Sequence, residues 1–266
     1  MLQPSFDTTA AAYDRRIGRW SRLYIPSLVA AARICPGDRV LDVATGTGEA
    51  AIAAAALAGP GGRVVGSDIS LPMLSAARSK TGGILVAAMD ALALACQDES
   101  VDAVICQLGL MLFPDAARGL REFRRVLRDG RWMAACVWSV PERAPFIGIF
   151  DDVMGRHVPD KREEIMASTS LGDRRRLHDL VAGAGFREVS VTPVTQQIAF
   201  ATFAEYWEPI AAGGSTTAAL YRDLPEAART SVRTEVRTRM QSHFLGERLV
   251  FETEALLAAG RKQGNV

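Results

Sequence analysis

The segment that decides the fold is VLDVATGTGEAA, residues 40–51, in which an apolar stretch leads into a glycine-containing turn and then an alanine-rich stretch. The apolar, partly β-branched start is typical of a buried strand, and the alanines that follow favour a helix. Gly46 and Gly48 allow backbone angles and a close ligand approach that a β-carbon would block. Because free N–H groups of the next helix face the same crevice, the segment predicts a site for a nucleoside-bearing ligand.

Short apolar stretches alternate with alanine-rich or amphipathic stretches from about residue 38 to residue 139. This alternation is typical of successive βαβ units around a parallel sheet whose two faces are buried. We predict strands at 39–44, 63–67, 84–88, 101–106 and 131–138, with helices near 48–58, 71–79 and 115–128. The predicted fold class is α/β, a doubly wound, mostly parallel, seven-stranded Rossmann-like sheet with helices on both faces and a helical lid.

The second half of the chain is less regular and is interpreted as an elaboration of the same sheet. We predict a helix near 173–184, a strand at 186–191, helices throughout 203–241 and a last strand at 248–257, on the edge of the sheet. The whole chain is interpreted as one domain. Its expected parts are an N-terminal helical cap at 1–37, a cofactor-binding core at 38–139, and lid or acceptor-site insertions at 140–170 and 203–245.

Composition narrows the range of partners and compartments. Thirty-one basic residues against thirty acidic ones leave a net charge of +1, so no overall field attracts a nucleic acid or an anionic membrane. No apolar stretch is long enough to span a bilayer, and no His, Cys and carboxylate cluster has metal-ligand spacing. The four separated cysteines are expected to be reduced, in a cytoplasmic protein. We therefore expect no nucleic acid partner, no membrane insertion and no metal.

Three aspartates help to choose between two cofactor classes. The glycine turn also satisfies a dinucleotide fingerprint, and Asp68, twenty residues beyond Gly48, could hold ribose hydroxyls in either class. Asp42 ends the first strand and Asp90 follows the third. A carboxylate in these places would repel a diphosphate but attract the sulfonium and ammonium groups of S-adenosylmethionine (SAM). The aspartates thus favour SAM over NAD.

Six stretches in order then resemble the motifs of the class I SAM-dependent methyltransferases, in the branch similar to the ubiquinone and menaquinone C-methyltransferases. They are VLDVATGTGEAA, VVGSDIS, LPMLSAAR, MDALAL, VDAVICQLGLMLFPD and FRRVLRDGRWMAACVW. The resemblance covers roughly residues 10–140. It implies methyl transfer from SAM to carbon, oxygen or nitrogen of a small-molecule metabolite, with S-adenosylhomocysteine (SAH) as product. The family usually has glycine where Ala44 stands, which narrows the space for the methionine part.

The resemblance also implies roles for individual residues. Those expected to line the methionine part include Asp42 and Ala44, while Asp68 would hold the ribose. Gln107 and Leu108 would lie beside the transferring methyl group. The full set expected at the cofactor is Tyr13, Asp42, Ala44, Thr45, Gly46, Gly48, Asp68, Ile69, Met73, Asp90, Ala91, Gln107 and Leu108. The alternative for Asp68 and Asp90 is that they only cap a helix or a turn.

Methyl transfer from a sulfonium is an in-line displacement, which needs alignment of the acceptor more than a dedicated base. For an acceptor of high pKa the candidate bases are His157 and His243, because their segments are expected to rise over the carboxyl edge of the sheet. Two other functions stay open: a SAM-binding protein with a non-methylating role, and an NAD-dependent oxidoreductase. Asp42 and the absence of a Tyr-x-x-x-Lys pair disfavour the oxidoreductase. Both a monomer and a homodimer are compatible with the sequence.

Overall fold

The computed structural model describes residues 18–80, 84–213 and 215–264. Its centre is one sheet with the strand order β3-β2-β1-β4-β5-β8-β6, and a short β7 pairs with β8. The strands are β1 Arg39–Val43, β2 Arg63–Asp68, β3 Leu85–Ala88, β4 Val101–Gln107, β5 Leu127–Trp138, β6 Arg187–Phe200, β7 Phe244–Leu245 and β8 Arg248–Arg261. The first five are parallel to one another, and β8 is antiparallel to both β5 and β6.

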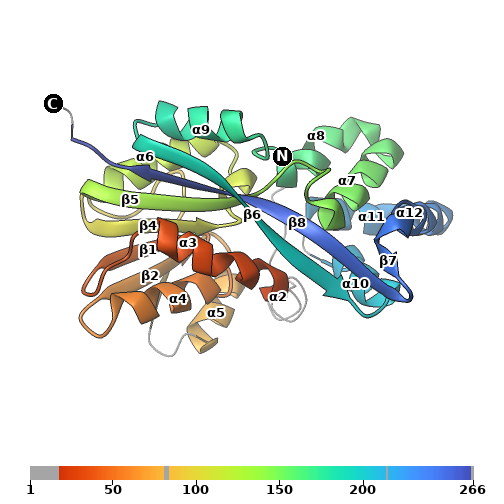
Figure 1. The fold of residues 1–266 in the computed structure, drawn as a ribbon, viewed down its shortest axis with the longest axis horizontal. Helices are drawn as coiled ribbons and strands as arrows, with labels where there is room; N and C mark the ends of the chain where they lie inside the picture. The colour runs from red at the N-terminus through yellow and green to blue at the C-terminus, as the bar shows by residue number, and fades with distance from the viewer. Residues whose placement is uncertain (1–17, 81–83, 214, 265–266) are drawn as a thin grey trace.

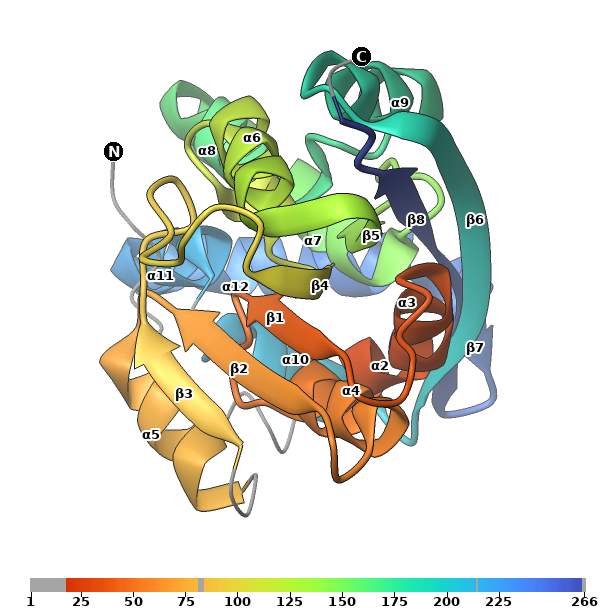
Figure 2. The same cartoon turned by 90° about the vertical axis from the view of Figure 1, so that its left-hand side faces the viewer.

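Helices cover both faces of the sheet. Figure 2, which looks along the strands, shows α6 and α9 on one side and α4 and α5 on the other. The α-helices are α2 Gly18–Ser21, α3 Ile25–Ala31, α4 Glu49–Ala58, α5 Leu71–Lys80, α6 Ala116–Val126, α7 Pro145–His157, α8 Arg162–Ile165, α9 Arg174–Gly183, α10 Phe203–Ala211, α11 Thr216–Asp223 and α12 Glu226–Arg239. Short 3₁₀ segments are η2 Arg22–Tyr24, η3 Leu110–Leu112, η4 Pro159–Lys161, η5 Met166–Thr169 and η6 Gln241–His243. The predicted doubly wound α/β fold is confirmed.

The prediction that the last strand lies on the edge of the sheet is wrong. Strand β8 lies between β5 and β6, and its second half, from Ala255 to Ala259, is buried on both faces. A continuous apolar run of this kind is typical of an inner strand. Strand β6 takes the edge instead, and its side chains are mostly exposed or half-buried. Pro193 lies within β6, where an edge strand tolerates its missing N–H.

Two long strands carry the chain beyond the carboxyl end of β5. Trp138, the last residue of β5, pairs with Ala255, whereas β6 and β8 stay paired as far as Phe200 and Leu249. Figure 1 shows α7, α10, α11 and α12 gathered at this end of the molecule. Among the helices of the described residues, none is long and apolar enough to cross a membrane. The two-stranded extension thus places the helices 203–239 past the end of the parallel strands.

Candidate active site

The turn between β1 and α4 has an unusual backbone. Ala44, Gly46 and Gly48 all adopt the left-handed conformation, with φ of 56°, 54° and 87°. For alanine this conformation costs about 1–2 kcal/mol, because its β-carbon crowds the following carbonyl oxygen. The N–H of Thr45 donates to the carbonyl of Ser67, so the turn is fastened to β2. Backbone strain that neighbouring hydrogen bonds hold in place is common at ligand-binding sites.

Asp42 lies immediately before this turn with a fully buried carboxyl group. The hydroxyl of Thr45 donates to its Oδ2 at 2.6 Å, whereas Oδ1 has no hydrogen-bond partner among the described residues. A β-carbon on Gly66 would lie 2.8 Å from the Thr45 hydroxyl, so β2 leaves room for this bond by having glycine there. Burial raises the pKa of Asp42 to about 7. The Thr45 hydroxyl and the backbone N–H of Ala51 only partly offset this burial, and a positively charged ligand group would offset it further.

Asp68 ends β2 and joins two turns. Its Oδ2 accepts from the N–H of Gly46 and its Oδ1 from the N–H of Ser70, each at 2.9 Å. Burial raises its pKa, while these backbone hydrogen bonds act in the opposite direction. Each carboxylate oxygen can accept a second hydrogen bond. The capping role and the ribose role weighed for Asp68 are therefore compatible with each other.

Apolar surface and a further acid lie along the same edge of the sheet. Ile69, next to Asp68, has a side chain that is 60% exposed, which leaves a face free for a flat ring. Met73, in α5, is buried. Asp90 is exposed, and its Oδ1 accepts from the N–H of Leu92 at 2.8 Å in a tight turn. Ala91, between them, is half-buried.

The end of β4 lies beside the end of β1, because the two strands pair in parallel. Gln107 donates from Nε2 to the carbonyl of Ser21 at 2.9 Å, which ties α2 to this strand. Its Oε1 is a second buried oxygen without a partner in the described part of the chain. Leu108 is buried and adopts a left-handed φ of 53°. Tyr13, expected here from the sequence, lies outside the described residues.

Gly109 is a residue that the sequence analysis missed. A β-carbon built on it would lie 2.5 Å from the β-carbon of Ala44 and 3.0 Å from Sγ of Cys106. The alanine in the first motif is thus accommodated by a glycine at the end of the neighbouring strand. Only the pairing of β1 with β4 reveals this, since 65 residues separate the two positions.

The two candidate histidines belong to the outer part of the molecule. His157 ends α7, and its Nε2 lies 3.4 Å from a carboxylate oxygen of Glu235 on α12. The ring of His243 packs on Phe251, with centroids 4.7 Å apart, and burial lowers its pKa. Phe251 is four residues past the partner of Trp138, which places it about 13 Å beyond the end of β5. The structure therefore does not bring His243 to Asp42 or Asp68.

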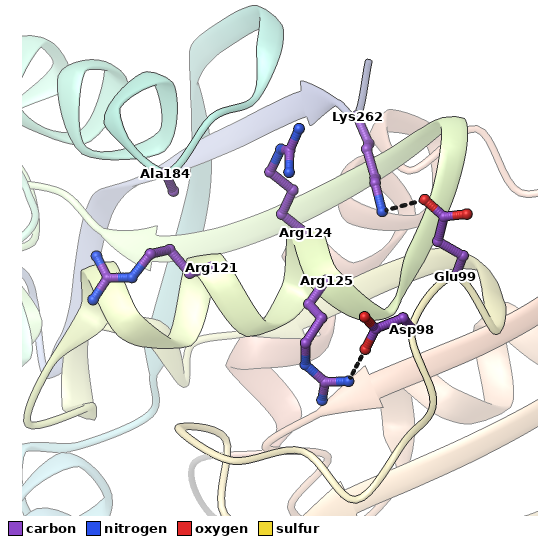
Figure 3. A pocket seen from close by; sticks show the side chains of 7 residues that line it. All are labelled: Asp98, Glu99, Arg121, Arg124, Arg125, Ala184 and Lys262. Carbon is purple, nitrogen blue, oxygen red and sulfur yellow. Dashed lines mark hydrogen bonds and ion pairs between the residues drawn. The ribbon is translucent and has the colours of Figure 1, made fainter. Parts of the chain in front are cut away.

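A hollow of about 590 Å³ lies at the opposite, amino edge of the parallel strands (Figure 3). It is lined by Asp98, Glu99, Arg121, Arg124, Arg125, Ala184 and Lys262. Arg125 bonds to Asp98 at 2.6 Å, and the ammonium of Lys262 lies 3.1 Å from Glu99. Arg125 also donates to the carbonyls of Leu94 and Cys96. These groups are engaged in holding β4, α6 and β8 together, so we assign the hollow a structural role.

Within the described residues, no group of three or more His, Cys, Asp and Glu side chains is arranged to hold a metal ion. The three acids at the carboxyl edge lie apart, at the ends of the neighbouring strands β1, β2 and β3. The glycine turn and the acid that ends β2 are typical of Rossmann-like nucleotide-binding enzymes, and the buried acid on β1 favours the SAM-binding class among them.

Comparison with known proteins gives the family. Residues 40–130 match a family model described as a methyltransferase domain. A demethylmenaquinone methyltransferase of Corynebacterium kroppenstedtii is 33% identical over 165 residues, which cover 58% of this chain and 70% of that protein. The chain belongs to the class I SAM-dependent methyltransferases and is related to these quinone methyltransferases. It spans about two thirds of the length of the curated relatives that it matches.

Solved structures share the fold at lower identity. A putative methyltransferase from Bacillus halodurans is 22% identical with a TM-score of 0.62, covering 90% of this chain and 99% of that one. A phosphoethanolamine N-methyltransferase from Haemonchus contortus, solved with SAH, is 17% identical with a TM-score of 0.59. That match covers 97% of this chain and 58% of the other. Both support the architecture described above.

Proposed function

We propose that this enzyme binds SAM at the carboxyl ends of β1 to β4 and transfers its methyl group to a small aromatic or quinone-like acceptor. The observation that carries the proposal is the buried carboxyl group of Asp42 beside the glycine turn, whose Oδ1 has no hydrogen-bond partner in the part of the chain that the structure describes. A dinucleotide would instead bring a diphosphate toward this carboxyl group, which repels it once ionised. The relatives also give no support to an NAD-dependent oxidoreductase.

In this proposal the acids bind different parts of the cofactor. Asp42 faces the ammonium end of the methionine part, together with Ala44, Thr45, Gly46 and Gly48. Asp68 accepts from the ribose hydroxyls with the lone pairs that Gly46 and Ser70 leave free. The remaining contacts are to the adenine, from Ile69, Met73, Asp90 and Ala91. SAH is the product that leaves the same site.

The residues of the chain mainly align the acceptor and exclude water. Bound SAM supplies a methyl group on a sulfonium, which the acceptor displaces in line. Gln107 orients the acceptor through its Oε1, which has no partner among the described residues, while its Nε2 holds α2 in place. Trp20 of α2 packs on Phe146 and Phe200, with centroids 6.0 Å and 4.5 Å away, so α2 closes this side with aromatic rings. Such closure removes water from the reacting groups.

The acceptor class rests on the relatives. The relatives are named as demethylmenaquinone methyltransferases. Trp138 at the end of β5 also packs on Phe146, at 5.2 Å, and both rings belong to the hydrophobic core. We further propose that 140–170 and 203–245 form the lid over the acceptor. All four cysteines are free thiols, which fits the reducing conditions of the cytoplasm.

Calorimetric titration tests the proposal. The purified protein is titrated with SAM, with SAH and with NAD, and the same titrations are made with Asp68→Ala. An exposed aspartate on α9 gives the matched control, Asp179→Ala. We expect micromolar binding of SAM and SAH that the control retains and Asp68→Ala loses. Binding of NAD alone, or of none of the three, would contradict the proposal.

A further inference from the structure

A second hollow, of about 420 Å³, lies between the start of α10, the end of α12 and the hairpin of β7 and β8. Phe203 and Phe244 give it an apolar wall, and Arg233 and Arg237 give it positive charge. Glu247 is the one acid among its lining residues. No residue proposed above for SAM lines this hollow, so any ligand here occupies a separate site.

No carboxylate among the described residues neutralises the two arginines. In the residues that the structure describes, neither Arg233 nor Arg237 makes a hydrogen bond or ion pair with a carboxylate, whereas Arg239 on another face of α12 bonds to Asp152. The guanidinium of Arg237 lies 5.5 Å from the ring centroid of Phe203. This cation–π contact holds the charge over the apolar wall and leaves its N–H groups available.

The spacing of the two arginines along α12 favours a ligand that carries a phosphate group. Residues four apart on a helix lie on one face, so Arg233 and Arg237 present two guanidinium groups side by side. Planar guanidinium groups match phosphate oxygens through paired hydrogen bonds. Phe203 is almost completely buried beneath Arg237, so the apolar surface that the hollow offers a ligand comes mainly from Phe244, which is half-buried. Charge and apolar surface are therefore combined in one hollow.

We propose that this hollow binds a phosphate monoester or diester that carries an apolar chain or ring. Its phosphate group lies on Arg233 and Arg237, and its apolar part lies against the exposed part of Phe244. A phospholipid headgroup at a membrane surface and a free phosphorylated metabolite share this chemistry. Arg233, Arg237 and Phe244 belong to the segment 203–245, proposed above as part of the lid, but none of them is a residue proposed for SAM, so the site does not depend on SAM binding at the carboxyl edge.

Binding of octyl phosphate below its micelle concentration tests the proposal, with inorganic phosphate and octanol as comparisons. We expect octyl phosphate to bind more tightly than either, because only it offers both the charge and the chain. The double variant R233Q/R237Q should bind it at least about tenfold more weakly. Glu247→Gln should bind it more tightly, since an opposing charge is removed. Arg175→Gln, on the exposed face of α9, is the control and should bind normally.

Vesicles distinguish the two sources of the phosphate group. Sedimentation with vesicles of phosphatidylcholine, with and without phosphatidic acid, is measured for the protein and for R233Q/R237Q. Binding only to the acidic vesicles, lost in the double variant, supports a lipid headgroup. Binding of octyl phosphate without vesicle binding supports a free metabolite. Failure to bind octyl phosphate, or equal binding by a double variant of unchanged melting temperature, would overturn the proposal.

Discussion

The side chain of Ala44 occupies the space that a side chain on Gly109 would need. A β-carbon built on Gly109 would lie 2.5 Å from the β-carbon of Ala44, across the ends of the paired strands β1 and β4. Ala44 and Leu108 both adopt left-handed backbone conformations, so the strain is on both sides of this contact. The turns after β1 and β4 border the proposed methionine site, and they pack closely against each other at Ala44 and Gly109.

This fit predicts strong coupling between the two positions. Gly109→Ala should reduce the free energy of unfolding by about 1–3 kcal/mol, because the new methyl group overlaps Ala44. Ala44→Gly alone should increase it by up to about 1 kcal/mol, since glycine adopts the positive φ without strain. In the double variant the cost of Gly109→Ala should largely disappear. Denaturant unfolding of the four proteins measures the coupling, and additive effects would contradict the contact.

The affinity for SAM should depend on pH through Asp42. Its pKa in the free protein is raised by burial to about 7, and the positively charged ligand favours the ionised carboxyl group. Affinity should therefore rise as the pH rises toward about 7 and level off above it, and binding below that pH should release a proton. Calorimetry in buffers of different ionisation enthalpy measures this release. Asp42→Asn should abolish the pH dependence; an unchanged dependence would assign it to another group.

The stability of the ligand-free protein should fall as the pH rises, whereas its affinity for SAM should rise. The folded pKa of Asp42 lies above its ordinary value of 3.8, so the folded state binds the proton more tightly. Its contribution to stability is fully present below pH 3.8 and is lost as the pH rises through about 7. Unfolding free energies across this window should fall less steeply in Asp42→Asn. An equal slope in both proteins would show that Asp42 does not titrate as described.

A second buried acid, on α7, links this helix to η5 and α11 by hydrogen bonds. Asp151 on α7 accepts from the hydroxyls of Ser168 and Thr217, at 2.6 Å and 2.8 Å, and burial raises its pKa to about 6. Thr217→Val removes one donor and should destabilise the protein by about 1–3 kcal/mol. Thr234→Val, at an exposed position of α12, should change stability little. Equal stability of the two variants in denaturant unfolding would show that the Thr217 bond contributes nothing.

The core of the fold could be predicted because its signals are local. Strands β1, β2 and β4 are short apolar runs that end in a turn or a helix, so each is visible within a few residues. The place of β8 was mistaken because strand order depends on long-range pairing. Two signals were present in the sequence: the apolar run from Ala255 to Gly260, and Pro193 in the strand that takes the edge.

The site could be predicted only in part. The position of Asp42 and Asp68 at strand ends follows from the sequence, and parallel strands bring such ends to one edge. The second role of Asp68, as acceptor for two backbone N–H groups, depends on turn geometry that spacing does not determine. The compensation of Ala44 by Gly109 arises from strand pairing, and a single sequence gives no signal for it.

The most direct test of the central claim is a crystal structure of the protein with SAH. The account predicts SAH across the carboxyl ends of β1 and β2, with its ribose hydroxyls within hydrogen-bond distance of Asp68 and its ammonium end toward Asp42. Asp68 should keep its bonds to Gly46 and Ser70 in this complex. SAH bound elsewhere, or a ribose without contact to Asp68, would contradict the account.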